Sequence, residues 1–185
     1  MAYIKTLSYE EADDELKAVY DNITGSRGKL AEVHKIQSLN PPALMAHMDL
    51  YLKVMFGKSP LKRYQREMLG VVVSAANRCP YCIEHHRQAL LFYWKDDERT
   101  RRFIANPSEA GLGAGDLALC RFAKALTEAP WESGEEQIEA LRRAGFDDRS
   151  ILDATQVIAY FNFVNRMVLA LGVEFNDEEA SGYNY

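Results

Sequence analysis

The sequence predicts an all-α protein built as a single helical domain. Apolar residues recur at helical spacing through most of the 185 residues, and strand-like alternation is nearly absent. No Asn-Gly or Asp-Gly pair marks a β-hairpin. Capping residues, prolines and glycines divide the periodic stretches into segments, as expected for a bundle of helices around one core. A chain of this length can bury a full hydrophobic core.

Four helices are expected in the first part of the chain. Ser8 and Glu11 form a capping box at the start of the first helix, and a Thr-Gly-Ser break at 24–26 follows its end. Asn40 and the two prolines after it start the third helix, because proline is favoured at the first helical position. The expected helices run from 8 towards 20, from about 30 to 37, from 41 to a stop at 57–60, and from 61 to 76.

Five helices are expected in the remainder. Cys79 precedes a proline and should therefore be the N-cap of a helix that reaches about Trp94. Ser133 and Glu136 form a second capping box, and Gly145 ends the helix that they open. The expected helices cover 79–94, 96–105, 116–129, 133–144, and 147 or 148 to 172, with a glycine-rich loop over 106–115.

The last helix is apolar on nearly every side between residues 151 and 171. Such a helix is buried all round, so we expect it to be the central helix of the bundle or part of an interface between subunits. We divide the single domain, 1–185, into an N-terminal helical extension over 1–40, a core over 41–175 and a tail over 176–185. The tail is acidic and then rich in Tyr, and we expect it to be mobile.

Composition excludes several classes of function. The net charge of -5 and the dispersed basic residues argue against a nucleic-acid partner. The helix over 151–171 contains Asp, Gln, Asn and Arg residues, too many for a membrane span. No basic start leads into an apolar run, so we expect no signal peptide. Three cysteines, two of them close together, do not form a secreted disulfide framework, and we expect a cytoplasmic protein.

One short motif gathers most of the reactive chemistry. Cys79 and Cys82 form a Cys-x-x-Cys pair, His86 follows four residues later, and Glu67 precedes the pair by twelve residues. Two thiols three residues apart on a helix lie within disulfide reach. A histidine one turn beyond the second thiol can take its proton, and a carboxylate on the preceding helix can orient that histidine. The motif predicts a thiol–disulfide redox centre with a proton relay, although the sequence permits the Glu67–His86 contact without showing it.

Two arguments compete for the position of the reactive thiolate. At the helix N-terminus, Cys79 feels unpaired backbone N–H groups and the positive end of the helix dipole. Cys82 instead has His86 at the i,i+4 position as a proton acceptor, with Glu67 behind it. Peroxide reduction needs a proton for the departing oxygen, so we expect Cys82 to attack peroxide. Disulfide exchange needs only an accessible thiolate, and there Cys79 can lead.

Other interpretations of these residues stay open. The cysteine pair could be half of a zinc site, which normally needs a second pair of ligands; only Cys120, His34 and His47 remain, none of them paired. The alternative function is a non-catalytic helical oligomer whose cysteine pair senses redox state or binds zinc. Two buried, inert thiols are a third possibility. Cys120 is expected in the core, and His85 points about 100° from His86 around the helix, outside the relay.

The spacing of Glu67, Cys79, Cys82 and His86 resembles the active-site signature of the alkylhydroperoxidase AhpD-like family, within the carboxymuconolactone decarboxylase-like superfamily. The segment 160–175 is similar to the subgroup called peroxidase-related enzymes. This resemblance spans most of residues 41–175, and it implies an AhpD-like helical bundle that assembles into homo-oligomers, commonly trimers or hexamers. Decarboxylase members of the superfamily lack the cysteine pair, which argues against decarboxylation.

The resemblance also implies an activity: an antioxidant peroxidase that reduces hydroperoxides or the disulfide of a partner protein. An external dithiol or a protein electron donor would regenerate it, with no cofactor and no metal. By this resemblance Cys82 is peroxidatic, Cys79 is resolving, and His86 and Glu67 relay the proton. The best-known members have a histidine just before the second cysteine, where this chain has Tyr81. A phenol donates a hydrogen bond but is a poor base at neutral pH, so Tyr81, like His85, is an auxiliary candidate only.

Overall fold

The computed structural model describes residues 2–175 and residue 179. These residues form nine α-helices and two short 3₁₀ turns, with no strand, so the all-α prediction is confirmed. The helices are α1 Asp14–Arg27, α2 Glu32–Lys35, α3 Pro41–Phe56, α4 Arg63–Ala76, α5 Pro80–Trp94, α6 Asp97–Ala105, α7 Ala114–Glu128, α8 Glu135–Arg143 and α9 Asp148–Leu171. The 3₁₀ turns are η1 Pro107–Glu109 and η2 Pro130–Glu132.

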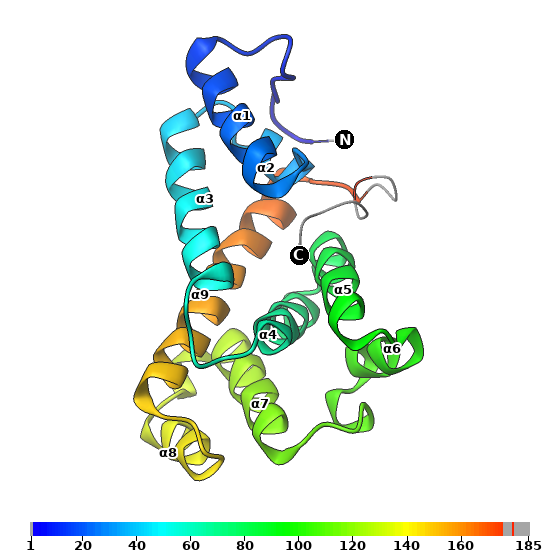
Figure 1. Ribbon diagram of the computed structural model, residues 1–185, viewed down its shortest axis with the longest axis vertical. Helices are drawn as coiled ribbons and strands as arrows, with labels where there is room; N and C mark the ends of the chain where they lie inside the picture. The colour runs from blue at the N-terminus through cyan, green and yellow to red at the C-terminus, as the bar shows by residue number, and fades with distance from the viewer. Residues whose placement is uncertain (1, 176–178, 180–185) are drawn as a thin grey trace.

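Helix α4 is the centre of the bundle. It packs against α5, α7 and α9, and these three helices surround it in Figure 1. Every residue from 66 to 74 is buried, including Arg66, Glu67 and Ser74. The Arg66 guanidinium donates to the Met55 carbonyl at 2.7 Å and the Leu61 carbonyl at 3.2 Å, which ties the α3–α4 connection to the central helix.

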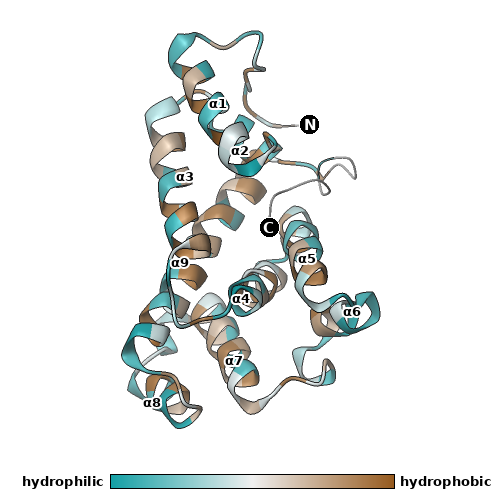
Figure 2. Cartoon of the chain, viewed as in Figure 1, coloured by the Kyte–Doolittle hydropathy of each residue, from teal (hydrophilic) through white to brown (hydrophobic). Residues whose placement is uncertain are grey.

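Helix α9, in contrast, is buried on one side only. Its buried apolar residues are Ile151, Ala154, Val157, Ile158, Tyr160, Phe161, Val164 and Val168. Leu152, Phe163 and Leu169 are 52%, 47% and 43% exposed, and Figure 2 shows hydrophobic residues along much of the helix. Of the two alternatives, the central helix is therefore excluded, because the second apolar side of α9 faces outward. An interface between subunits at this side stays a prediction.

The N-terminal extension packs as a second, smaller layer. Leu16, Tyr20 and Ile23 of α1 form a cluster with Leu44 and Met48 of α3, and this cluster is separate from the main core. In Figure 1, α1, α2 and α3 lie together at one end of the molecule, with α4 to α8 at the other. The two layers meet around α9, and the extension closes one side of the cavity described below.

Several helix ends differ from the predictions. Ser8 and Glu11 do exchange hydrogen bonds, at 3.0 and 3.4 Å, but they close a turn, and α1 begins only after Asp13. The expected break at 24–26 is wrong, because Thr24 Oγ1 donates to the Tyr20 carbonyl at 2.8 Å and the helix continues to Arg27. Its C-cap is Gly28, whose φ of 78° favours glycine.

The other boundary errors are small. Gly134, rather than Ser133, is the N-cap of α8, and its N–H donates to the Gln137 side chain at 2.7 Å. Helix α4 begins two residues later than expected, α7 begins at 114, and the expected loop at 106–115 contains η1. The caps predicted at Asn40 and Cys79 are confirmed. Of the two candidates for the cap of α9, residues 147 and 148, Asp147 is the N-cap.

Of the predicted tail, residues 176–178 and 180–185 lie outside the described residues. Glu179 is described, and it is buried, with 6% of its surface exposed. None of the helices in the described part of the chain has the length and apolar character needed to span a bilayer.

Candidate active site

The turn between α4 and α5 sets the position of the first cysteine. Arg78 adopts a left-handed conformation with φ of 55°, and the Cys79 N–H donates to the Ser74 carbonyl at 2.9 Å. The Asn77 side chain holds this turn against α9, since it donates to Asn162 Oδ1 at 3.0 Å and Asn165 Oδ1 at 3.1 Å. Cys79 is thereby fixed as the N-cap of α5.

Both cysteines of the motif are free thiols, and their sulfur atoms are 2.7 Å apart. The hydrogen bond between them lowers the pKa of Cys79 and raises the pKa of Cys82. One shared proton stabilises the first thiolate and disfavours the second, so the pair titrates as a unit. Asn165 also hydrogen-bonds Cys82, and this contact acts in the opposite direction, lowering the pKa of Cys82.

The two thiols differ in access. Cys79 has no exposed surface, whereas Cys82 is 4% exposed and lines a cavity between the two layers of the fold. The third cysteine, Cys120, is buried in the core away from this cavity, and burial raises its pKa to about 12. The prediction that Cys120 is a core residue is confirmed.

The predicted contact between the glutamate and the histidine is present. Glu67 Oε2 lies 2.8 Å from His86 Nδ1, and Arg63 Nη2 donates to the other carboxylate oxygen at 2.8 Å. Burial would raise the pKa of Glu67, but the hydrogen bond and charge of His86, together with the charge of Arg63, hold the pKa below its ordinary value. An ionised Glu67 accepts the Nδ1–H of His86 and leaves Nε2 to take up or return a proton.

Gly70 makes room for the histidine ring. A Cβ at this position would lie 3.0 Å from His86 Cγ and Nδ1 and 3.1 Å from the Phe161 ring. The two rings pack edge to face, with centroids 4.2 Å apart. The absence of a side chain on α4 therefore lets His86 sit between Glu67 and Phe161.

The cavity beside Cys82 has a volume of about 90 Å³. Since one water needs about 10–15 Å³ by the same measure, the cavity can hold a small organic molecule. Its walls come from both layers of the fold: the segment from α1 to α2, and helices α3, α4, α5 and α9. Much of the wall is apolar, built by Met48, Tyr51, Ala89, Phe161 and Val164. All four histidines of the chain line it.

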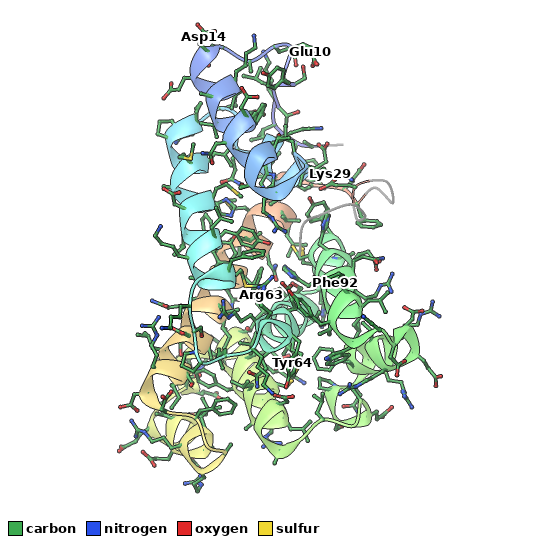
Figure 3. All side chains as sticks on the ribbon, viewed as in Figure 1. Glu10, Asp14, Lys29, Arg63, Tyr64 and Phe92 are labelled. Atoms are coloured by element: carbon green, nitrogen blue, oxygen red, sulfur yellow. The ribbon has the colours of Figure 1, made fainter. Side chains whose placement is uncertain are left out.

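The two auxiliary candidates, Tyr81 and His85, line the cavity and contact Glu179. The Tyr81 hydroxyl accepts from the Val33 N–H at 3.2 Å and donates to Glu179. The His85 ring packs 4.4 Å from Tyr81, and its Nε2 lies 3.4 Å from Glu179 Oε1. Lys29, labelled in Figure 3, donates to the Glu179 carbonyl at 2.9 Å. Tyr81 therefore joins α5 to the N-terminal extension and to residue 179.

The sequence did not reveal a group of polar residues that also lines the cavity. His47, which the sequence analysis set aside as unpaired, lies 2.6 Å from the Tyr160 hydroxyl and 2.9 Å from Gln37 Oε1. His34 also lines the cavity, where it accepts the Ala31 N–H. His47 and Tyr160 are 113 residues apart in the sequence, so no local spacing signals their contact.

No three His, Cys, Asp or Glu residues gather closely enough to hold a metal ion in the part of the chain that the structure describes.

Comparison with known proteins places this geometry in a family. The model of the carboxymuconolactone decarboxylase family matches residues 42–125, which include the whole motif. A peroxidase-related protein from Silicibacter sp. TM1040 is 30% identical, with a TM-score of 0.87 over 97% of this chain and 94% of that one. A peroxidase-related protein from Ralstonia eutropha JMP134, described as an alkylhydroperoxidase AhpD core, is 26% identical, with a TM-score of 0.87 over the same shares.

A further relative is known from its sequence. The protein YdfG of Bacillus subtilis (strain 168) is 22% identical over 129 residues, or 70% of this chain and 85% of YdfG. The fold, the matched family model and these relatives together lead to one conclusion: the chain belongs to the AhpD-like group of the carboxymuconolactone decarboxylase superfamily.

Proposed function

We propose that this protein is a thiol-dependent peroxidase that reduces small organic hydroperoxides with the Cys79–Cys82 pair. The observation that carries the proposal is that Cys82 is the thiol on the cavity wall, with Cys79 2.7 Å behind it. His86, held by Glu67, lines the same cavity. The peroxidase-related neighbours support this choice of reaction.

In the first step the pair passes one proton to His86, and the Cys82 thiolate attacks the terminal oxygen of the hydroperoxide. The O–O bond breaks, a Cys82 sulfenic acid forms, and an alkoxide leaves. His86 donates a proton to the alkoxide and so releases an alcohol, because an alkoxide leaves poorly without one. Glu67 stabilises the charged imidazolium that exists before this transfer. Sulfur is oxidised by two electrons and the O–O bond is reduced by two.

In the second step the Cys79 sulfur attacks the sulfur of the sulfenic acid. Water leaves, and a Cys79–Cys82 disulfide forms. An external dithiol, or a protein that carries one, then reduces this disulfide by thiol–disulfide exchange and is itself oxidised. The short distance between the two sulfur atoms favours this closure over a disulfide with Cys120.

The pKa order and the access to the cavity favour different cysteines. The thiol–thiol hydrogen bond lowers the pKa of Cys79, which makes Cys79 the more acidic thiol of the pair. Because Cys82 alone of the pair lines the cavity, a substrate meets Cys82 first. A proton that moves over the 2.7 Å between the sulfurs exchanges the two forms, so the more accessible sulfur attacks.

The test uses Cys79→Ser, Cys82→Ser and Cys120→Ser variants treated with tert-butyl hydroperoxide and a sulfenic-acid trap. The trap should label Cys82 in Cys79→Ser, and labelling should slow in the Cys79→Ser/His86→Ala double variant. Cys120→Ser should behave as the wild type, and mass spectrometry of the oxidised protein should find the Cys79–Cys82 disulfide. Labelling of Cys79 alone, in Cys82→Ser, would reverse the assignment. Stoichiometric zinc and no peroxide consumption would favour the non-catalytic alternative.

The remaining expectations belong to this proposal. The protein works in the cytoplasm as a homo-oligomer, a trimer or hexamer, with the exposed apolar side of α9 buried between subunits. Its partners are the hydroperoxide or disulfide substrate and the dithiol donor, and it needs no cofactor.

A further inference from the structure

Two residues of the cavity wall, His47 and Tyr160, belong to a chain of polar groups that continues to Gln37. The direction of each hydrogen bond in this chain follows from the donors and acceptors present. Gln37 Nε2 donates to the Val33 carbonyl at 2.8 Å, which fixes the orientation of the amide. Gln37 Oε1 therefore faces His47 Nδ1, 2.9 Å away. An amide oxygen only accepts, so His47 Nδ1 must carry the proton.

The next link follows from that tautomer. Burial lowers the pKa of His47 to about 4, so the ring is neutral at physiological pH. With the proton on Nδ1, Nε2 can only accept. The Tyr160 oxygen lies 2.6 Å from this nitrogen, so the Tyr160 O–H donates to His47.

Tyr160 consequently turns an acceptor towards the cavity. Its single hydroxyl proton is committed to His47, which leaves the oxygen lone pairs available. The ring is held by Tyr51, stacked at 5.7 Å, and by Phe161 at 5.1 Å. Tyr160 lines the same cavity as Cys82, and a charge on Cys82 is close enough to raise the pKa of Tyr160 further.

We propose that Tyr160 is a substrate-binding residue that accepts a hydrogen bond from the O–H of the substrate, and that His47 and Gln37 are positioning residues that fix it in this role. The inference rests on the proposed function, since a hydroperoxide is the substrate that brings an O–H to Cys82. The terminal oxygen that Cys82 attacks carries this hydrogen, so one contact both recognises the substrate and aims its reacting atom.

The proton balance agrees with this role. The hydroxyl proton of Tyr160 stays between Tyr160 and His47 throughout, and His86 supplies the proton of the alcohol. After attack, the oxygen transferred to sulfur still carries its hydrogen and keeps its bond to Tyr160. Burial first, and nearby charges second, raise the pKa of Tyr160 well above its ordinary value, so it acts as a neutral acceptor and never as a base.

The decisive experiment measures binding without turnover. Reduced wild-type protein is titrated by NMR with tert-butanol, which has a hydroxyl donor, and with tert-butyl methyl ether, which has none. One neutral hydrogen bond favours the alcohol over the ether by about threefold to tenfold. In Tyr160→Phe this preference should disappear. Tyr64→Phe is the matched control: Tyr64, labelled in Figure 3, donates to Asp116 rather than lining the cavity, and its loss should leave the preference intact.

The positioning role of His47 is tested by asking whether its loss turns the Tyr160 hydroxyl from an acceptor into a donor towards the ligand. In His47→Phe the Tyr160 O–H loses its acceptor and turns towards the cavity as a donor, so the alcohol-to-ether preference should fall and ether binding should strengthen relative to alcohol binding. A role in packing alone would weaken both ligands together. ¹⁵N NMR of the wild type should find His47 neutral with its proton on Nδ1, a result that does not depend on any variant folding.

Either of two outcomes would overturn the inference: an alcohol preference that persists in Tyr160→Phe, or a His47 proton on Nε2. A wild type that shows the preference but reduces no hydroperoxide would contradict the proposed function instead, so the two failures are distinguishable. Where turnover is measured, Tyr160→Phe should raise KM for tert-butyl hydroperoxide severalfold.

Discussion

Cys79 lies directly behind Cys82, with its sulfur 2.7 Å from the sulfur of Cys82 and with none of its own surface exposed. In the proposed reaction, this arrangement gives the two cysteines different roles. A molecule in the cavity meets Cys82, and the product of that encounter is already within reach of Cys79. His86 and Glu67, the proposed proton relay, both line the cavity, where a leaving group would need a proton.

Removal of the charge on Glu67 should slow peroxide reduction. In Glu67→Gln the amide oxygen can still accept the His86 Nδ1–H, but the imidazolium loses its counter-charge, so we expect kcat/KM for tert-butyl hydroperoxide to fall by about 10²-fold. Glu84→Gln is the control, because Glu84 lies on α5 and pairs with Arg87 outside the cavity. Equal losses in the two variants would show that the effect of Glu67 is general electrostatics rather than the relay.

Cys79, Cys82 and His86 could be chosen as candidate site residues because their signal is local. Cys79, Cys82 and His86 share one helix start, and a proline after the first cysteine fixes where that helix begins. The cap at Asn40 was predictable for the same reason. Glu67 needed a further step, since its contact with His86 depends on how α4 and α5 pack.

The rest of the site depends on contacts that the sequence does not encode locally. Tyr160 and His47 are 113 residues apart, and each looks ordinary by itself. The central position of α4 was hidden as well, because charged residues such as Arg66 and Glu67 rarely mark a fully buried helix unless their buried partners are known. The apolar pattern of α9 left a central position and a subunit interface both open, and only the packed structure shows that its second side faces outward.

A methyl group at Gly70 should disturb the contact between His86 and Glu67 by displacing the His86 ring. In Gly70→Ala the new Cβ would lie 3.0 Å from the His86 ring, so the ring must shift against Glu67 or Phe161. Overpacking of this kind costs about 1–3 kcal/mol, against about 1 kcal/mol gained in helix propensity. We expect a lower peroxidase rate and a small loss of stability in urea denaturation.

The control for this change is Gly115→Ala in α7. A Cβ there meets its nearest atoms at 3.6 Å, an ordinary contact, so stability and activity should stay the same or improve slightly. If Gly70→Ala and Gly115→Ala had the same peroxidase rate and the same stability in urea, the close packing of His86 against α4 would not matter for activity or stability.

A charge on the outer side of α9 should weaken assembly. Leu152, Ala159 and Phe163 follow one another at helical spacing on this side, and all three are exposed in the single subunit. Ala159→Glu places a carboxylate among them without touching the core, so we expect smaller particles in light scattering and an unchanged far-UV circular dichroism spectrum. Ala140→Glu, on the exposed side of α8, should leave the particle size unchanged. A wild type that is already monomeric at micromolar concentration would contradict the predicted interface.

The two buried histidines should make the protein sensitive to mild acid. Burial, with the charge of His47 second, lowers the pKa of His34 to about 3, and burial lowers the pKa of His47 to about 4. Arg27 and His85 also face His34 and lower its pKa, whereas Glu179 raises it. In the unfolded chain both rings titrate near the ordinary histidine pKa of about 6.5.

The direction of the pH effect follows from these values. As the pH falls below about 6.5, both histidines become protonated in the unfolded chain. In the folded protein they are protonated only near pH 4 for His47 and pH 3 for His34. The free energy of unfolding is therefore highest above about pH 6.5 and falls as the pH drops from there towards about 3. From pH 7 to pH 5 the loss should be about 2 kcal/mol for each histidine. Urea denaturation at the two pH values measures it, and His47→Gln should show about half the loss of the wild type. Equal stability at pH 7 and pH 5 would mean that both rings are already protonated in the fold, and would also remove the acceptor on which the orientation of Tyr160 depends.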